Sequence, residues 1–236
     1  ADGYEFAEAE EDGLWKIVKS PVAEIVGGDK YATLGEAIAA LTGGETIKLL
    51  ANYTAAKDAD VSLAIAKDCT IDLGSYTLTI GNDLLGKYTD KDYVFAVLEG
   101  VEVTFTNGTI AQSDGGNYGL QVYGTVNVEC AMSKVGAAAP VFDIYGGCDA
   151  TVNVLDGADI TSEADVFRHK KPASKASVYV SGGTIETTGT GNYGIFNASS
   201  YPGTDDVAVI TGGTFLGRFE QTEKWGGMTL LGADAA

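Results

Sequence analysis

A short pattern recurs along this chain and constrains its fold more than any other feature. Two apolar residues flank one further residue, and a glycine follows a few positions later. The clear copies are Val103/Phe105 before Gly108, Val152/Val154 before Gly157, Val178/Val180 before Gly183, and Ala208/Ile210 before Gly213. Weaker copies occur at Ile47/Leu49, Ile71/Leu73 and Val126/Val128, with Asn52, Tyr76 and Ala131 in the glycine position. Period-two alternation is typical of a strand that buries one face, and the glycine indicates a turn.

The spacing of these copies favours one repeat architecture. Their first residues are 47, 71, 103, 126, 152, 178 and 208, so the intervals are 24, 32, 23, 26, 26 and 30 residues. A helical repeat would hold its period, whereas a β-helix stacks its strands in register and lets the turns between them vary. We therefore predict an all-β protein, a right-handed parallel β-helix of about seven coils.

Each copy is followed by two further strand-like pieces. The first comes directly after the turn, as in Gly183-Thr184-Ile185, where a β-branched residue precedes an apolar one. The second comes later, at 93–97, 118–122, 141–144, 165–168 and 193–196. Three strands per coil predict a triangular cross-section. The polar segments 86–92 and 199–206 fill the two longest intervals and are predicted to protrude as loops.

The two ends of the predicted rod differ. Thr33 and Glu36 form a capping-box pattern, an apolar helical face follows, and Gly43-Gly44 would end the helix, so 33–42 is predicted to cap the N-terminal end. Before it, 4–6 and 14–18 flank Glu11-Asp12-Gly13 as a β-hairpin would. The predicted units are a hairpin connector (1–30), a capping helix (31–44), the β-helix (45–217) and a C-terminal capping or assembly segment (218–236).

Several segments resemble a known family. Three segments resemble the opening of pectin-lyase-like β-helix domains in bacterial secreted and surface repeat proteins. They are Tyr31-Ala32-Thr33-Leu34-Gly35-Glu36-Ala37-Ile38, Gly44-Glu45-Thr46-Ile47-Lys48-Leu49-Leu50 and the stretch from Cys69 to Thr79. In tandem members, a piece like Gly212-Gly213-Thr214-Phe215 closes one domain and one like Ala1-Asp2-Gly3-Tyr4 opens the next connector. The resemblance implies head-to-tail self-association, through Tyr4, Phe6, Trp15, Phe215, Phe219 and Trp225.

Charge and composition limit the classes of binding partner that this chain could have. The net charge of −18 opposes binding to nucleic acid and to anionic membranes, and no apolar run is long enough to insert in a bilayer. The acidity indicates a soluble extracellular protein, with weak Ca²⁺ binding as the alternative and no other cofactor expected. The chain begins at Ala1, which is compatible with removal of a signal peptide. Its three cysteines are expected to be buried, and a bridge between Cys130 and Cys148 stays open.

No catalytic cluster is recognised, and the expectation is that the chain is not an enzyme. The family's hydrolases combine an Asn-Thr-Asp strand, paired aspartates, Gly-His-Gly and Arg-x-Lys. Asp205-Asp206 and Arg168-His169-Lys170 match two of these motifs, but Asn-Thr-Asp and Gly-His-Gly do not occur, so the set is incomplete. The best candidate for a ligand or anion site is Arg168, His169, Lys170 and Lys171, for which the simpler interpretation is a solvated turn.

Tyr93, Tyr118 and Tyr193 recur at equivalent positions and could form an edge ladder or a sugar-binding face. Asn52, Asn107 and Asn197 begin glycosylation sequons.

Three functions are consistent with these sequence features. The first is a non-enzymatic extracellular structural protein, namely a surface stalk, layer or fibre subunit that assembles through its termini. The second is an adhesin or glycan-binding surface module that uses loops 86–92 and 199–206. The third, disfavoured by the missing motifs, is a polysaccharide lyase or hydrolase.

Overall fold

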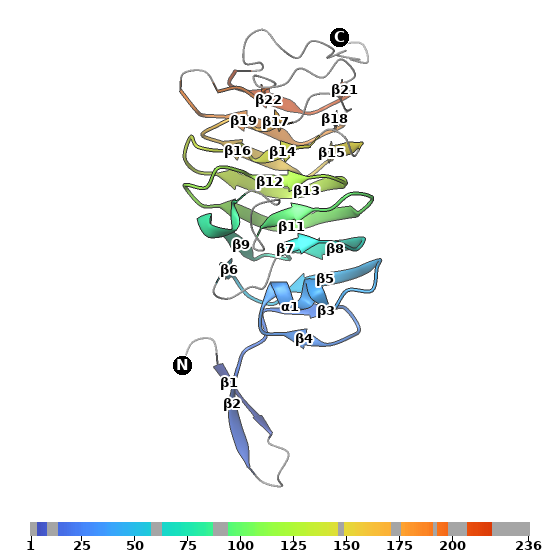
Figure 1. Cartoon of the computed structure of the whole chain (residues 1–236), viewed down its shortest axis with the longest axis vertical. Coiled ribbons are helices and arrows are strands. Elements are labelled where there is room, and N and C mark those ends of the chain that lie inside the picture. Colours follow the sequence, from blue (N-terminus) through green and yellow to red (C-terminus); the bar gives the residue numbers. More distant parts are fainter. Residues whose placement is uncertain are drawn as a thin grey trace.

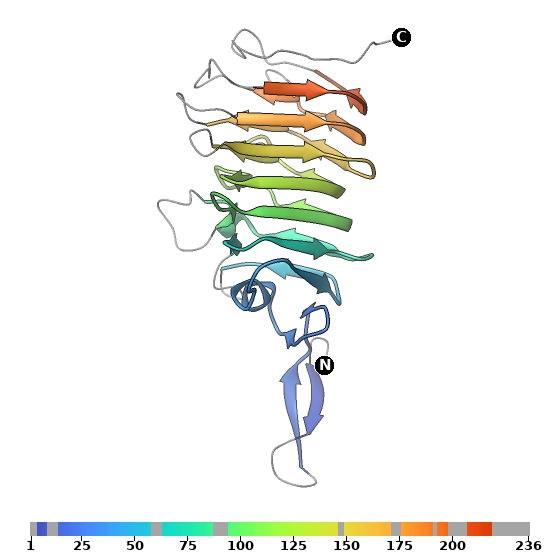
Figure 2. The ribbon, with the colours of Figure 1, turned by 90° about the vertical axis from the view of Figure 1, so that its right-hand side faces the viewer.

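Parallel strands that stack along one axis build most of this molecule (Figures 1 and 2). The computed structural model describes residues 4–8, 14–57, 63–86, 94–145, 149–170, 176–190, 193–197 and 207–218. Within these residues the chain is mostly β and contains a β-solenoid of about five turns, an N-terminal two-stranded hairpin and one short α-helix. The parallel solenoid predicted from the repeats is therefore confirmed, with fewer turns than the seven expected.

The first row of stacked strands holds the recurring apolar pairs. In axial order its members are β5 (Glu45–Leu49), β8 (Cys69–Asp72), β11 (Glu102–Gln112), β13 (Thr125–Lys134), β15 (Ala150–Val154), β18 (Ala176–Val180) and β21 (Val207–Ile210). Each pairs in parallel with the next, so the backbone hydrogen bonds run along the solenoid axis.

Two further rows complete each turn, as the sequence predicted. One consists of β7 (Leu63–Ile65), β10 (Phe95–Val97), β12 (Leu120–Val122), β14 (Phe142–Ile144), β17 (Phe167–His169) and β20 (Phe196–Asn197). The other consists of β6 (Tyr53–Ala55), β9 (Thr77–Ile80), the second halves of β11 and β13, β16 (Asp159–Ser162), β19 (Thr184–Thr187) and β22 (Thr214–Leu216). Within the described residues, the last repeat contributes β21 and β22 but no third strand, so it is not a full turn.

The register of the second repeat differs from the sequence prediction. The repeat frame aligned Ile71 with Val103, but in the structure Ile71 pairs with Phe105 and Cys69 pairs with Val103. A slip of two residues keeps the same face inward, so the hydrophobic pattern alone could not distinguish the two registers. The corrected frame also moves the turn position of this repeat from Tyr76 to Gly74, whose φ is +60°.

Inward-facing side chains form continuous columns along the axis. One column runs through Ile47, Ile71, Phe105, Val128, Val154 and Val180, all at most 1% exposed. On the second row Phe142, Phe167 and Phe196 stack, with ring centroids 5.4 and 5.2 Å apart. Like residues therefore sit above one another at the strand spacing, which packs the core without gaps between turns.

The N-terminal end of the solenoid is closed by the chain itself. Strand β3 (Ala23–Ile25) pairs antiparallel with β5 and with β4 (Lys30–Tyr31), which covers the first strand edge. Helix α1 (Leu34–Ala39) packs near β7 and begins with the predicted capping box, in which Thr33 and Glu36 bond each other's backbone N–H groups. Beyond this cap, β1 (Tyr4–Glu8) and β2 (Trp15–Lys19) form an antiparallel hairpin that projects along the axis (Figure 1).

Glycine at the turn after the first row is required for two separable reasons. Gly183 has φ +76°, and a Cβ there would lie 2.7 Å from the carbonyl oxygen of Ala158 in the previous turn. Gly157 has φ +90°, but its nearest neighbour would be 3.6 Å away. Both positions therefore disfavour a side chain through φ, and Gly183 adds a backbone clash.

We predict that Gly157→Ala costs roughly 1–2 kcal/mol of unfolding free energy and that Gly183→Ala costs at least about 1 kcal/mol more. Urea titrations of both variants and the wild type measure this difference. Equal losses in the two variants would contradict the close approach between turns at Gly183.

Candidate functional site

Strand β17 carries two of the four basic residues singled out by the sequence, Arg168 and His169. Arg168 and His169 are neighbours in an extended strand, so they point to opposite sides of the sheet. Lys170 follows the strand on the same side as Arg168, and Lys171 lies outside the described residues. The structure therefore places Arg168 and His169 in a strand rather than in a solvated turn, and it does not bring their side chains together.

Arg168 forms a buried ion pair with an aspartate one turn earlier. Its Nε lies 2.7 Å from Oδ1 of Asp143 and its Nη2 lies 3.0 Å from Oδ2. The Asp143 side chain is fully buried and that of Arg168 is 16% exposed. Such a two-point contact fixes the guanidinium in one orientation, and its charge is neutralised within the chain.

The same ion pair also holds a connecting loop against the second row of strands. Asp143 Oδ2 accepts a hydrogen bond of 2.9 Å from the Gly119 N–H, and Arg168 Nη2 donates one of 3.0 Å to the Asn117 carbonyl. Nearby, Gln121 donates to the Gly86 carbonyl at 2.6 Å. These contacts lie on the outward side of β12, β14 and β17, so the loops cover a polar layer instead of leaving it to solvent.

His169 belongs to the core. It pairs in register with Ile144, which itself pairs with Val122, and its side chain is fully buried. A residue in this inward column does not contact solvent, so it is not placed to act on a dissolved substrate. Lys170 instead lies over an aromatic ring, with Nζ 4.9 Å from the centroid of Tyr118.

The structure contains a second buried acid that the sequence reasoning missed. Asp165 is 4% exposed and accepts hydrogen bonds from the Gly194 N–H at 2.9 Å and from the Asn197 amide. Burial raises the pKa of its carboxyl above the ordinary range, while the bonds from Asn197 and Gly194 oppose this. A raised pKa is common in catalytic acids, but here both oxygens are bonded within the chain.

Lys134 is another polar residue in the interior that the sequence reasoning missed. It is 2% exposed, and its Nζ donates to the carbonyls of Ser113 at 2.5 Å and Gly115 at 3.1 Å. Burial lowers the pKa of this amine, and Asp114 acts in the opposite direction. It lies in an inward column with Gln112 and Ser162, where polar side chains bond the backbone of the turns.

The predicted assembly residues fall into two groups. Tyr4, Phe6 and Trp15 lie on the hairpin and are 51%, 73% and 67% exposed. Phe215 lies on β22 and packs partly buried against the core. Phe219 and Trp225 lie outside the described residues.

The three sequons differ in accessibility. Asn197 is 6% exposed and donates to Asp165, so the folded chain does not offer its amide for modification. Asn107 is exposed, with φ +59° and a 2.8 Å bond to Asp72. Asn52 is also exposed, and it accepts a bond of 2.9 Å from the Thr77 N–H. Tyr118 and Tyr193 are half-buried, and Tyr93 lies outside the described residues.

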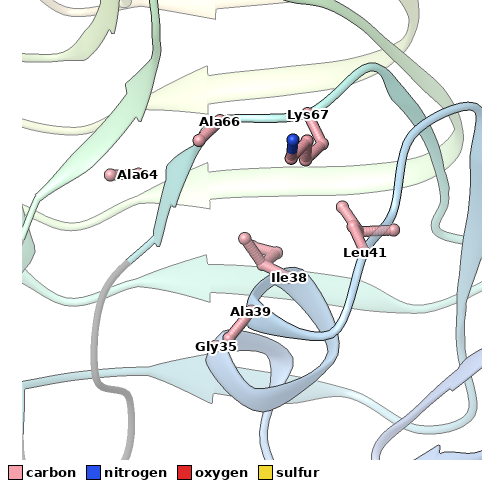
Figure 3. A pocket seen from close by; sticks show the side chains of 7 residues that line it. All are labelled: Gly35, Ile38, Ala39, Leu41, Ala64, Ala66 and Lys67. Atoms are coloured by element: carbon pink, nitrogen blue, oxygen red, sulfur yellow. The ribbon is translucent and has the colours of Figure 1, made fainter.

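Among the hollows formed by the described residues, two bear on whether a small ligand or an ion could bind. One is a cavity of about 210 Å³ between α1 and β7, where Ile38 and Leu41 face Ala64 and Ala66 with Lys67 beside them (Figure 3). It is smaller than ordinary ligand pockets. The other is lined by Asp68, Glu102 and Asp149, but no group of three or more acidic, histidine or cysteine side chains among the described residues is placed to hold a metal.

The cysteines whose positions are described are buried free thiols. Burial raises the pKa of Cys69 and of Cys130 to about 12, with neighbouring acidic residues adding to the effect. Cys148 lies outside the described residues. The bridge left open between Cys130 and Cys148 is not formed in this structure, because the Cys130 thiol is free.

Comparisons with known proteins identify no relative. No protein-family model, no curated protein and no solved structure matches the chain. The family resemblance drawn from the sequence is therefore supported at the level of the β-solenoid alone. Within the described residues, no helix is long and apolar enough to cross a membrane.

We predict that Arg168→Met lowers the unfolding free energy by about 3–5 kcal/mol, because it leaves the buried Asp143 carboxylate without its counter-charge. The double variant Arg168→Met/Asp143→Asn should regain part of this loss. Lys170→Met, a neighbouring cation on an aromatic ring, should cost less than about 1 kcal/mol. Urea unfolding measures all three, and similar losses for Arg168→Met and Lys170→Met would contradict the importance of the ion pair.

Proposed function

We propose that this chain is a non-enzymatic structural subunit of an extracellular stalk, layer or fibre. The observation that carries the proposal is the hairpin of β1 and β2, which projects from the capped end of the solenoid (Figure 1). Its large aromatic side chains, Tyr4, Phe6 and Trp15, are exposed. A free two-stranded hairpin is marginally stable in water, and exposed apolar patches of this kind mark contact surfaces.

The polar interior supports the same proposal. The buried charged groups Arg168, Asp143 and Asp165 are bonded to one another or to the backbone of adjacent turns. Their contacts hold turns and loops in place. An elongated solenoid stabilised in this way suits a spacer or lattice element, whose stability grows with contacts between neighbouring turns.

The extracellular location is part of the proposal. A net charge of −18 keeps such a rod soluble and repels nonspecific anionic partners. The alternative, an adhesin or glycan-binding module, relies on loops 86–92 and 199–206, of which only Gly86 lies within the described residues. A lyase or hydrolase of this fold would need a basic residue beside clustered carboxylates, and the hollow lined by Asp68, Glu102 and Asp149 has no arginine or lysine among its lining residues.

Immunogold labelling of the producing cells, with antibodies against the full chain, tests this function. We expect dense labelling of a continuous coat or of filaments outside the cell. In parallel, the purified chain should leave pectin and related polysaccharides unchanged, as measured by reducing ends and unsaturated products. Intracellular labelling, or turnover abolished by Asp165→Asn, would overturn the proposal.

A further inference from the structure

The hairpin of β1 and β2 concentrates its large apolar side chains on one face. Strand register places six side chains on this face as three cross-strand pairs, namely Tyr4 with Lys19, Phe6 with Ile17, and Glu8 with Trp15. We call these six residues the hairpin apolar face. Its four apolar members are each at least half exposed. The opposite face carries a more polar set, namely Glu5, Ala7, Lys16 and Val18.

This face needs a second layer that the solenoid of the same chain does not supply. A hairpin of two strands is marginally stable in water and becomes stable when a further element packs on it. Only Ser20 and Pro21 separate β2 from Val22, whose N–H bonds the Tyr31 carbonyl at 2.8 Å in the N-terminal cap. The hairpin therefore cannot fold back on the solenoid, and Figures 1 and 2 show it extending away along the axis.

The C-terminal segment of the same chain starts too far away to be a good cover. It follows Arg218, at the opposite end of the solenoid from the hairpin. Seven strand spacings of about 4.8 Å, roughly 34 Å in total, separate β21 from β3. At about 3.3–3.6 Å per extended residue, residues 219–236 would use roughly half their length in passing the solenoid alone. A second molecule is the better occupant.

The charges on the face indicate which second molecule fits. Glu8 and Lys19 lie at opposite ends of it, about 13 Å apart along the strands, with Phe6 and Ile17 between them. If two copies pack face to face with antiparallel strands, Lys19 of each copy lies level with Glu8 and Trp15 of the other. Each lysine then gains an opposite charge and an aromatic ring. The hairpin apolar face is therefore complementary to itself.

The other face-to-face orientation is opposed by charge. With parallel strands, Glu8 of one copy would lie level with Glu8 of the other, and Lys19 level with Lys19. The two solenoids would also lie side by side, although each chain carries a net charge of −18. In the antiparallel orientation the solenoids point away from each other, which reduces this repulsion.

The size of the face fits a reversible contact between two copies. A buried aromatic side chain covers roughly 150–250 Å², so the three aromatic residues, each half to three-quarters exposed, leave on the order of 300–500 Å² uncovered. Two such faces would bury roughly 600–1,000 Å² before Ile17 is added, which is at the lower end for specific interfaces. Association should therefore depend on protein concentration.

We infer that two copies of this chain pair through their hairpin apolar faces, with antiparallel strands, as a two-layer sandwich. Both copies use the same surface, so the contact closes at two copies and the solenoids extend outward from a shared centre. It thereby differs from the head-to-tail assembly that the family resemblance implies, which would leave a free surface after each addition. The inference rests on the proposed structural function and identifies its basic unit as a two-copy rod.

Charge-reversal variants of the full chain test the pairing by sedimentation velocity. The wild type should change from one copy to two as concentration rises, and its mass should stop there. Glu8→Lys and Lys19→Glu each turn both end contacts into like-charge pairs, so each variant alone should need at least about a tenfold higher concentration to dimerise. An equimolar mixture of the two variants should dimerise as the wild type does, because every end contact again joins opposite charges.

Matched controls reverse the same charges on the opposite face of the hairpin. Glu5→Lys and Lys16→Glu should dimerise as the wild type does, and thermal unfolding checks that every variant retains the folded solenoid. A wild type that stays monomeric or grows beyond two copies would overturn the inference. So would a Glu5→Lys protein as impaired as Glu8→Lys, or a mixture that fails to restore pairing. A monomeric wild type that still labels a surface coat would overturn the pairing and leave the structural function standing.

Discussion

Hydrogen bonding between in-register parallel strands of successive turns is the constraint on which the rest of this structure depends. Once Cys69 pairs with Val103 and Ile71 with Phe105, every inward residue of one turn is stacked on an inward residue of the next. Side chains can then pack as columns, such as the one from Ile47 to Val180, at the strand spacing of about 4.8 Å. Turn glycines and caps serve to keep this stacking uninterrupted.

Polar groups exploit the same vertical spacing. Arg168 finds Asp143 directly beneath it because the two residues occupy the same outward column in adjacent turns. Asn153 donates to Asn127 in another column, and Asp165 accepts from Asn197 across a turn. Such contacts join residues more than 20 positions apart in sequence. Charged side chains that a sequence reader could take for reactive groups therefore stabilise the solenoid.

The sequence predicted the solenoid, the three rows of strands, the N-terminal hairpin and the capping box at Thr33 and Glu36, because each has a strong local pattern. It misplaced the second repeat by two residues, since Ile71/Leu73 and Cys69/Ile71 alternate equally well. It also overlooked the partner of Arg168. Asp143 lies 25 residues earlier, close to one coil period, so matching charges at that spacing would have found it. The inward direction of His169 depends on the exact strand start, which periodicity fixes poorly.

Register in the second repeat offers the most direct test of this account. The structure pairs Thr104 with Thr70, whereas the alternative frame would place Thr104 opposite Asp72. In a Cys148→Ser background, mild oxidation of Thr70→Cys/Thr104→Cys should give a disulfide, because paired Cα atoms lie within the roughly 4.4–6.8 Å that a bridge requires. Peptide mapping by mass spectrometry would detect it. A disulfide in Asp72→Cys/Thr104→Cys instead, with none in the first pair, would contradict the in-register pairing of β8 with β11 on which this account depends.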